Sequence, residues 1–320
     1  MNEYDSEKIS SILQKDGYMN SGDISNADLV VFNTCNIREK AAQKVYSDIG
    51  RVTKKDNSKT IALVGCVAQA ENDEIFKKNK NVDIVLGPQS YHLLPKMIDA
   101  YKKNKEKKIN TEFIINEKFD FVHEDKSPKG VSSYVTIQEG CDKFCAFCVV
   151  PFTRGPEYSR SIKSIVDEAK SLIDRGSKEI VLLGQNVNAY NYKDEKNIVY
   201  NISNLIDEVS KLDNIKRIRY TTSHPNNMDL ELIKLHGSNE KLMPFLHLPV
   251  QSGSNEILKK MNRKYNVDEY KKIIDQLKFY KPNIEISSDF IVGFPGETNN
   301  DFESTLDLVE YVKFKQSYSF

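Results

Sequence analysis

The feature that most constrains this sequence is a regular alternation of short apolar runs with longer amphipathic stretches. In the first hundred residues, three apolar, β-branched runs that end in turn residues occupy 28–35, 60–66 and 82–87. Helical patterns lie between and around them, at 6–17, 37–55, 70–79 and 90–103. Asp5 or Ser6 is a suitable cap for the first of these helices. Such an alternation predicts an α/β fold in which helices cover a parallel sheet.

A second series of the same kind begins near residue 131. Its candidate strands are 132–138, 179–184, 215–222, 244–250, 284–292 and 316–320. Its candidate helices are 161–175, 200–211, 228–236, 254–262, 267–280 and 299–313. Six strand–helix units predict a barrel or partial barrel, with reactive groups at the C-terminal ends of the strands.

The stretch between the two series, residues 102–130, has a different composition. It contains the lysine-rich segments KKNKEKK and HEDKSPKG, which we interpret as a solvated surface connection rather than an RNA-binding patch. We therefore predict an N-terminal domain over 1–115, a linker over 116–131 and a second domain over 132–320.

Charge and hydropathy exclude several classes of protein. Lysine plus arginine and aspartate plus glutamate both total 46, so the chain as a whole has no basic footprint for nucleic acid. No apolar run approaches the ~18 residues of a membrane span, and the N-terminus lacks a signal-peptide pattern. We expect a cytoplasmic protein with no membrane partner.

Three of the five cysteines lie within eight residues. They are Cys141, Cys145 and Cys148 in the segment GCDKFCAFC, a C-x3-C-x2-C pattern just after a predicted strand. In a reducing compartment, clustered cysteines indicate metal binding or catalysis rather than disulfides. Three thiolates on one loop suit three corners of a cubane iron–sulfur cluster, which leaves one iron open to chelate S-adenosylmethionine (SAM). The alternative is a zinc site, which normally needs a fourth cysteine or histidine at fixed spacing.

The segment EGCDKFCAFCVVPFTRGPEYSR resembles the signature of the radical-SAM methylthiotransferases. LLGQNVNAY, TTSHP, LPVQSGS-x-x-ILKKMNRKY and DFIVGFPGET resemble further blocks of that family in the same order, and MNEYDSEK, NTCNIREKA and VGCVAQ resemble its N-terminal domain. Several motifs match the MiaB type in particular. The resemblance implies a flavodoxin-like parallel sheet domain, then a radical-SAM core that is a partial (β/α)6 TIM-type barrel.

The same resemblance implies an activity. MiaB-type enzymes add a methylthio group to carbon 2 of N6-isopentenyladenosine beside the anticodon of tRNA. Two other branches act on threonylcarbamoyl-adenosine in tRNA and on an aspartate of a ribosomal protein, and a non-catalytic iron–sulfur or zinc RNA-binding module is an alternative from another class. The implied partners are a tRNA anticodon stem-loop and an electron donor such as flavodoxin or ferredoxin, and we expect a monomer.

The resemblance also implies a second, auxiliary [4Fe–4S] cluster in the N-terminal domain. Two of its three family cysteines correspond to Cys35 and Cys66, whereas the first lies two residues before the position of Met1. Judged without the resemblance, both would more often be buried packing residues. Because of this departure, and because the last predicted strand stops at Phe320 with no closing helix, we expect a chain truncated at both ends, without its first strand, the end of the barrel or the family's RNA-binding TRAM domain.

Polar residues at strand ends are the remaining candidates. The resemblance places SAM near Gly184, Gln185 and Asn186, and a similar role is expected for Gln251 and Ser252. Ser288 and Asp289 form a polar pair inside an apolar strand, which is costly without partners and favours cofactor contact. In each case an ordinary turn or structural role is the alternative.

Two arginines and two histidines remain open from the sequence. Arg154 and Arg160 flank Gly-Pro-Glu, where contact with RNA or cofactor and a structural salt bridge are equally good interpretations. His224 follows a predicted strand, and His247 within an apolar strand is interpreted as structural.

Overall fold

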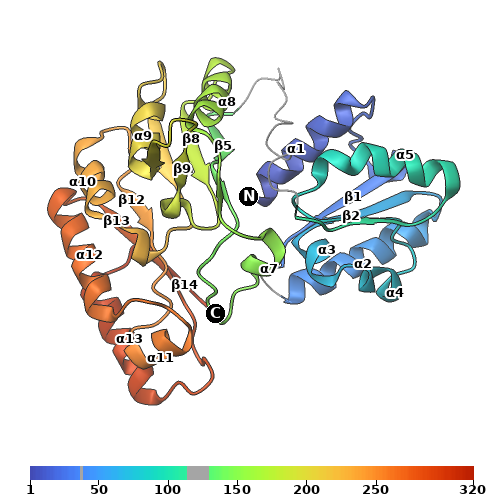
Figure 1. Ribbon diagram of the computed structural model, residues 1–320. Coiled ribbons are helices and arrows are strands. Elements are labelled where there is room, and N and C mark those ends of the chain that lie inside the picture. Colours follow the sequence, from blue (N-terminus) through green and yellow to red (C-terminus); the bar gives the residue numbers. More distant parts are fainter. Residues whose placement is uncertain (37–38, 114–129) are drawn as a thin grey trace. The chain divides into compact units, whose positions relative to one another are not determined.

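The structure is a computed structural model that describes residues 1–36, 39–113 and 130–320 (Figure 1), with the side chains of 39–41 left aside. The chain groups into two compact units, Met1–Asp125 with Val149–Pro156, and Lys126–Cys148 with Glu157–Phe320. Most of the predicted linker 116–131 lies outside the described residues. The assignment of Val149–Pro156 to the first unit differs from the single boundary that composition suggests.

The first unit is built on a parallel sheet of order β1-β2-β3-β4. Its strands are β1 (Leu29–Thr34), β2 (Thr60–Gly65), β3 (Ile84–Leu86) and β4 (Lys108–Asn110). The first three fall within the predicted runs, which confirms the parallel α/β architecture. The fourth was not predicted, because its sequence, KIN, lies in the lysine-rich stretch interpreted as a connection. Charged residues of this kind are common on edge strands, where they discourage pairing with other chains.

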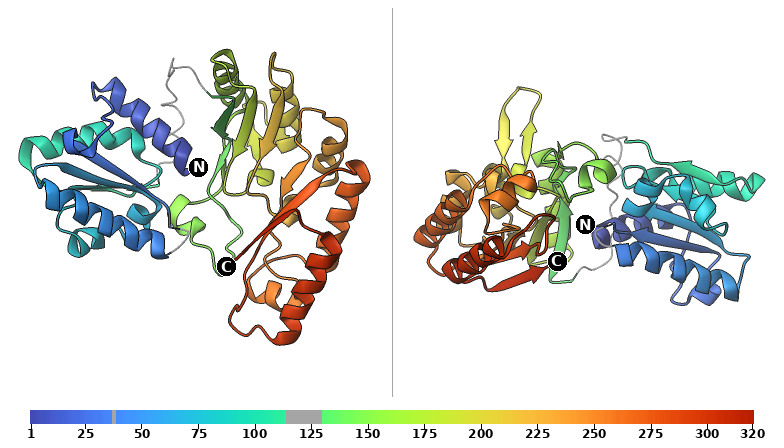
Figure 2. Two further views of the ribbon diagram at one scale, coloured as in Figure 1. Left: turned by 180° about the vertical axis from the view of Figure 1, so that it is seen from behind. Right: turned by 90° about the horizontal axis from the view of Figure 1, so that it is seen from below.

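Helices cover both faces of this sheet. They are α1 (Asn2–Lys15), α2 (Glu39–Lys55), α3 (Cys66–Glu71), α4 (Glu74–Lys78) and α5 (Leu94–Asn104), with 3-10 turns at Ile24–Asn26 and Tyr91–Leu93. Two views show α1 and α5 on one face and α2, α3 and α4 on the other (Figures 1 and 2). Each face buries its own apolar cluster against the strands. This three-layer arrangement explains why the β2 strand is entirely buried.

Two local predictions in this unit are wrong. Helix α1 begins at Asn2 with Met1 as its N-cap and no side-chain cap, so neither Asp5 nor Ser6 caps it. Asp5 is instead inside the helix and buried. The single helix predicted over 70–79 is divided into α3 and α4 around Asn72, whose positive φ of 51° ends the first of them.

The second unit contains six parallel strands that follow one another in chain order. They form two three-stranded sheets of order β11-β8-β5 and β12-β13-β14, and an isolated parallel bridge joins Ile218 to Leu242. The strands are β5 (Ser132–Thr136), β8 (Glu179–Leu183), β11 (Arg217–Tyr220), β12 (Phe245–His247), β13 (Glu285–Phe290) and β14 (Gln316–Ser319). This agrees with the predicted (β/α)6 partial barrel.

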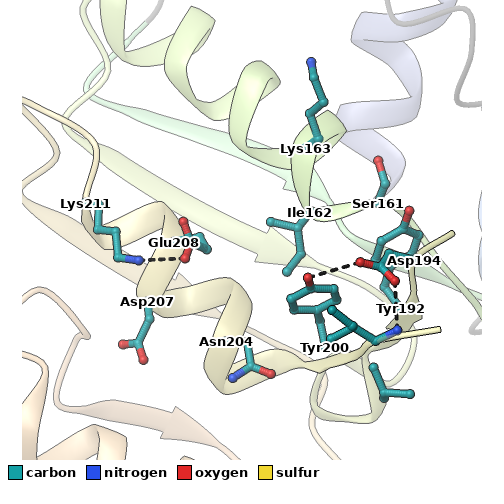
Figure 3. Close-up of a pocket in the computed structure, with 12 residues that line it drawn as sticks. Ser161, Ile162, Lys163, Tyr192, Asp194, Tyr200, Asn204, Asp207, Glu208 and Lys211 are labelled. Atoms are coloured by element: carbon teal, nitrogen blue, oxygen red, sulfur yellow. Dashed lines mark hydrogen bonds and ion pairs between the residues drawn. The ribbon is translucent and has the colours of Figure 1, made fainter. Parts of the chain in front are cut away.

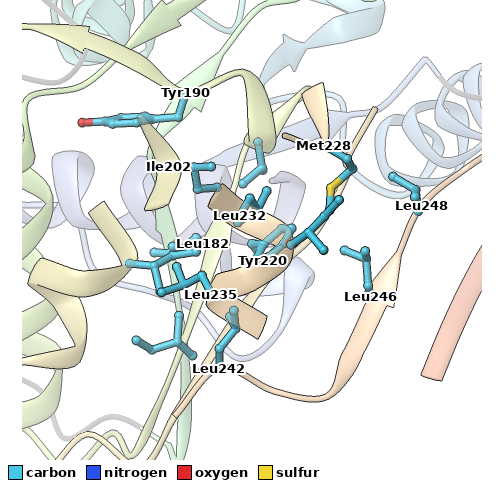
Figure 4. Close-up of a cluster of buried hydrophobic side chains, with 14 of the residues drawn as sticks. Leu182, Tyr190, Ile202, Tyr220, Met228, Leu232, Leu235, Leu242, Leu246 and Leu248 are labelled. Atoms are coloured by element: carbon cyan, nitrogen blue, oxygen red, sulfur yellow. The ribbon is translucent and has the colours of Figure 1, made fainter. Parts of the chain in front are cut away.

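The helices of this unit pack on the outside of the strands. They are α8 (Ile162–Asp174), α9 (Ile202–Ser210), α10 (Leu230–Ser238), α11 (Asn255–Lys260), α12 (Val267–Tyr280) and α13 (Asn299–Val312). Figure 4 shows leucines of the strands and of α10 meeting in one buried cluster. A β-hairpin, β9 (Asn191–Lys193) with β10 (Val199–Asn201), and a short pair, β6 (Gln138–Glu139) with β7 (Tyr158–Ser159), were not predicted. No helix in the described ranges has the length and apolarity to cross a bilayer.

Candidate functional site

The three clustered cysteines lie on the loop that follows β6, beyond the C-terminal end of the first barrel strand. Cys145 is buried, and Cys141 and Cys148 are half-buried. Burial raises the pKa of the Cys141 thiol to about 11, and the nearby Cys148 and Cys145 thiols add to this rise. The Cys148 amide donates to the Cys145 carbonyl at 2.9 Å, which folds these two cysteines into one tight turn.

Contacts with the two residues that follow α11 hold this loop. Phe144 has a positive φ of 48°, and its carbonyl oxygen accepts a hydrogen bond of 2.8 Å from Asn262 Nδ2. The Ala146 amide donates to the Met261 carbonyl at 3.0 Å. The loop conformation is therefore set by residues more than a hundred positions later in the chain.

The donor set fits an iron–sulfur cluster better than a single metal ion. A structural zinc ion normally takes four protein ligands, whereas in a cubane cluster each cysteine binds a different iron. Three soft thiolates on one loop therefore match three corners of a cluster and leave one iron open.

The loop after β8 is fastened to the cysteine loop by two glutamines. Gln138, fully buried, accepts hydrogen bonds through Oε1 from the Gln185 and Asn186 amides at 3.0 and 3.1 Å, and its Nε2 donates to the Gly140 carbonyl at 2.6 Å. Gln185 Oε1 in turn accepts from the Gly140 amide at 2.6 Å. A Cβ at Gly184 would lie 2.6 Å from Gln138 Oε1, so this close approach requires glycine. Gln138 was not singled out in the sequence.

Asn186 has an unsatisfied acceptor. Its side chain is buried, and Nδ2 donates to Glu157 Oε1 at 3.1 Å and to Asn227 Oδ1 at 3.2 Å. Its Oδ1 is buried and accepts no hydrogen bond from any described residue. Because buried polar atoms are nearly always paired, an unpaired acceptor beside the cysteine loop fits a ligand that brings a donor.

The segment after β12 is shaped by its backbone. Gln251 has a positive φ of 76° and forms a parallel bridge with Phe290. Ser252 Oγ is buried and accepts from the Ser254 amide at 3.1 Å. The structure thus gives Ser252 a partner within its own turn.

Ser288 and Asp289 have different surroundings. Ser288 Oγ is fully buried and accepts from the Val250 amide at 2.9 Å, so this hydroxyl links β13 to the segment that follows β12. Asp289 is half-buried, and its Oδ2 lies 3.4 Å from His247 Nε2, while His247 Nδ1 shares a 2.8 Å hydrogen bond with Ser287 Oγ. The polar groups open to a ligand here are therefore Asp289 of β13 and His247 of the neighbouring strand β12.

Arg263 is a residue of the site that the sequence reasoning missed. It is buried, and its guanidinium donates to Cys145 Sγ at 3.5 Å, to the Pro249 carbonyl at 2.7 Å and to Tyr265 Oη at 2.9 Å. Burial acts to lower the pKa of Arg263, but the facing Tyr265 and Cys145 outweigh it and raise that pKa. The only sequence signal was an arginine inside the motif MNRKY, next to a helix end.

His224 lies beside this arginine. Burial, together with the positive charge of Arg263, lowers the pKa of His224 to about 2, so the imidazole is neutral at ordinary pH. Its Nδ1 accepts from the Asn226 amide at 3.2 Å, and its ring meets the Tyr265 ring edge-on at a centroid distance of 5.7 Å. The proton of the neutral ring is therefore on Nε2.

The N-terminal cysteines meet at one edge of the first unit's sheet. Cys35 directly follows β1, and Cys66 directly follows β2 as the first residue of α3. The two strands pair in parallel, with Thr34 opposite Gly65. The adjacent strand ends therefore place the two cysteines at neighbouring positions of the sheet.

The two arginines left open by the sequence are both buried and ion-paired. Arg160 pairs with Glu168 at 2.7 Å and donates to the Thr136 carbonyl at 2.6 Å, which supports a structural role. Arg154 pairs with Asp5 at 2.7 Å in the first unit.

A pocket of about 750 Å³ lies elsewhere in the second unit (Figure 3). It is bounded by the β9–β10 hairpin and by α8 and α9, and its rim carries the Lys211–Glu208 ion pair and the hydrogen bond from Tyr200 Oη to Asp194. None of the candidate site residues lines it.

Comparison with known families finds one match in the N-terminal part of the chain and another in the rest. Residues 135–309 match the radical SAM superfamily, and residues 1–87 match a family of uncharacterised proteins designated UPF0004. Among solved structures, a radical S-adenosylmethionine methyltransferase from Kitasatospora setae, TsrM, shares 13% identity at a TM-score of 0.70, over 99% of this chain and 71% of that one. At this level of identity the likeness shows the fold alone.

Curated relatives are much more similar. A tRNA-2-methylthio-N(6)-dimethylallyladenosine synthase of Rickettsia akari is 51% identical over 100% of this chain and 74% of its own length. The synthase of the same name from Rickettsia bellii is 52% identical over the same shares. The chain therefore belongs to the radical-SAM methylthiotransferase family, of the MiaB type, and is a transferase of that class.

Proposed function

We propose that this enzyme transfers a methylthio group to carbon 2 of N6-isopentenyladenosine beside the anticodon of tRNA. The observation that carries the proposal is the identity of 50–52% with synthases named for this product, which extends over all of this chain. The loop of Cys141, Cys145 and Cys148 supports it, because three thiolates and one open iron are what SAM activation needs.

Two groups of residues would hold the cofactors. Cys141, Cys145 and Cys148 would bind a [4Fe–4S] cluster that carries SAM, and Cys35 and Cys66 would supply two of the three cysteine ligands of an auxiliary [4Fe–4S] cluster. When bound, these groups supply the reductive cleavage of SAM and the sulfur that is transferred.

The chain's own residues would orient SAM and set the charge around it. Asn186 Oδ1 offers a buried acceptor for a donor group of SAM. Asp289, beside His247, offers a carboxylate at the end of the fifth barrel strand for a cofactor hydroxyl or amine. Arg263 holds a positive charge against Cys145 at every accessible pH, because a guanidinium does not deprotonate in proteins. Gly184, Gln185, Gln251 and Ser252 shape the backbone around this site.

The substrate must present an accessible base. A splayed-out base of an anticodon stem-loop meets this need better than a base stacked in a duplex. An electron donor such as flavodoxin or ferredoxin would reduce the cluster, and the enzyme would act in the cytoplasm as a monomer.

The test is anaerobic reconstitution of the protein with iron and sulfide, followed by dithionite and SAM. Methionine and 5′-deoxyadenosine should form, and Cys145→Ala should abolish both products. Cys66→Ala separates the two cysteine sets, because it should stop methylthio insertion while SAM cleavage continues. If a cluster-loaded protein never cleaves SAM, the radical-SAM activity is refuted and a non-catalytic RNA-binding module is favoured.

Nucleoside mass spectrometry of tRNA from a deletion strain identifies the substrate. Loss of the methylthio group from isopentenyladenosine supports the proposal. Loss from threonylcarbamoyl-adenosine, or from a ribosomal-protein aspartate in a parallel peptide analysis, would assign the enzyme to one of the other branches.

A further inference from the structure

Glu157 is a half-buried carboxylate that contacts both the cysteine loop and the loop after β8. Its Oε1 accepts hydrogen bonds from the Asp142 amide, next to Cys141, at 3.3 Å and from Asn186 Nδ2 at 3.1 Å. The Glu157 amide in turn donates to Asp142 Oδ1 at 3.3 Å. All of these residues belong to the second unit. One side chain therefore links the two loops that border the candidate site.

The strand pairing next to the cysteine loop places Glu157. It directly precedes β7, and β7 pairs in the antiparallel direction with β6, with Tyr158 opposite Glu139. The cysteine loop continues from the end of β6, so the residue before Tyr158 lies beside the first residues of that loop. This register explains the two-way hydrogen bonding between Glu157 and Asp142.

Glu157 determines which end of the Asn186 side chain is free. Asn186 Nδ2 donates one hydrogen to Glu157 and the other to Asn227 Oδ1 at 3.2 Å. The Asn186 backbone amide donates to Gln138 Oε1. A carboxylate can only accept, so Glu157 requires the NH2 end of the Asn186 side chain to face it. The oxygen end is turned away, and Oδ1 is the buried acceptor that has no partner among the described residues.

A second pair of the same kind shows a purely structural contact. Glu231 Oε2 accepts from Asn201 Nδ2 at 2.7 Å, and Asn201 Oδ1 accepts from the Asn204 amide at 3.0 Å as the cap of α9. Both ends of the Asn201 side chain are therefore satisfied within the protein. The corresponding oxygen of Asn186 is buried and unpaired, which costs free energy unless a ligand supplies a donor.

We propose that Glu157 is a positioning residue for SAM, and that it fixes the Asn186 side chain with Oδ1 toward the cofactor. Glu157 does not itself contact SAM; it acts through the orientation of Asn186. Because the free enzyme already holds this acceptor in its binding orientation, no side-chain freedom is lost at Asn186 when SAM binds. This inference rests on the proposed function, which places SAM beside these two loops.

Equilibrium dialysis of labelled SAM against the full chain, reconstituted anaerobically with iron and sulfide, measures binding without turnover, because no reductant is added. Glu157→Ala removes the partner of Asn186 Nδ2, so the dissociation constant of SAM should rise about tenfold, which corresponds to one hydrogen bond. Glu157→Gln should bind SAM as the parent does, because the glutamine Oε1 can accept both hydrogen bonds. Glu231→Ala is the matched control and should also equal the parent. All variants are compared at equal iron content.

A double-mutant cycle tests whether Glu157 acts through Asn186. Asn186→Ala should also weaken SAM binding by about tenfold, and the addition of Glu157→Ala should weaken it no further. Two independent contacts would instead multiply to a loss of about a hundredfold, and that result overturns the inference.

The single variants give two further ways to refute the positioning role. Unchanged affinity in Glu157→Ala overturns it, and so does a loss in Glu157→Gln as large as that in Glu157→Ala, because the charge itself then binds SAM. If Glu157→Ala does not fold, Glu157→Asp replaces it, since the shorter side chain keeps the charge but draws back from Asn186 Nδ2. If the cluster-loaded parent binds no SAM, the SAM site of the proposed function fails and this inference fails with it.

Discussion

Replacement of Gln138 by leucine tests whether one buried side chain holds the cysteine loop and the Gln185–Asn186 loop together. Leucine has a similar size but offers no hydrogen bond, so the Gln185 and Asn186 amides lose their acceptor and the Gly140 carbonyl loses a donor. Each buried group left unpaired costs about 1–3 kcal/mol. Because Gln185 is only half-buried, we expect a total in the lower part of the summed range, about 3–5 kcal/mol.

A loss of this size is a large part of the ~5–15 kcal/mol that stabilises a typical domain. Urea unfolding followed by circular dichroism would measure it, and amide hydrogen exchange at Gln185 and Asn186 would show where it arises. Gln89→Leu is the matched control, because buried Gln89 donates one hydrogen bond, to the Arg154 carbonyl, and its loss should cost about 1–3 kcal/mol. Unaltered exchange at both amides in Gln138→Leu would refute the role assigned to this glutamine.

Three further outcomes follow from individual positions. Burial lowers the pKa of His236 to about 4, so between pH 6.5 and 4 the unfolded chain binds a proton that the folded chain does not. The free energy of unfolding should therefore fall by about 3 kcal/mol as the pH drops through this window. The urea midpoint of His236→Gln should lack this dependence on pH. A Cβ at Gly253 would overlap the Ser304 carbonyl, so Gly253→Ala should destabilise the protein by about 1–3 kcal/mol in thermal melts. Gly50 lies in an open helical position, so Gly50→Ala should raise stability by about 0.5–1 kcal/mol in the same assay. Arg263→Lys cannot reach Cys145, Pro249 and Tyr265 together, so the SAM concentration for half-maximal cleavage should rise about tenfold or more; an unchanged value would show that the guanidinium fork is not needed.

The sequence was a good guide to the strands and to the three-cysteine loop. Buried parallel strands must be short, apolar and β-branched, and that requirement can be read in 60–66 or 179–184 without any tertiary information. Strand β4 was not predicted because Lys108 and Asn110 flank a single isoleucine. Its pairing with β3 depends on the rest of the sheet rather than on its own composition. The β9–β10 hairpin likewise lacks the two-residue glycine turn that marks the clearest hairpins.

The side chains that complete the site could not be predicted for a different reason. Asp5 reads locally as a helix cap, because aspartate near a helix start usually is one. Its real partner is Arg154, 149 positions along the chain, and no local pattern encodes such a separation. Gln138 and Arg263 are similar cases, since each is a polar residue whose burial becomes visible only when distant segments are assembled.

These long-range pairs share a physical logic. Cys66 and Cys145, one in each unit, both accept a hydrogen bond from a buried arginine. Thiolates collected on one site accumulate negative charge, and burial makes that charge costly unless a donor or cation compensates it. Arginine suits this task better than lysine, because its charge is independent of pH and its fork can bond the sulfur and a second group at the same time. The second group differs: a carboxylate at Asp5 in one unit, and the neutral Pro249 carbonyl and Tyr265 hydroxyl in the other. The charge of Arg154 is therefore matched by a carboxylate, whereas the charge of Arg263 is available to offset that of the three clustered thiolates, beginning with Cys145.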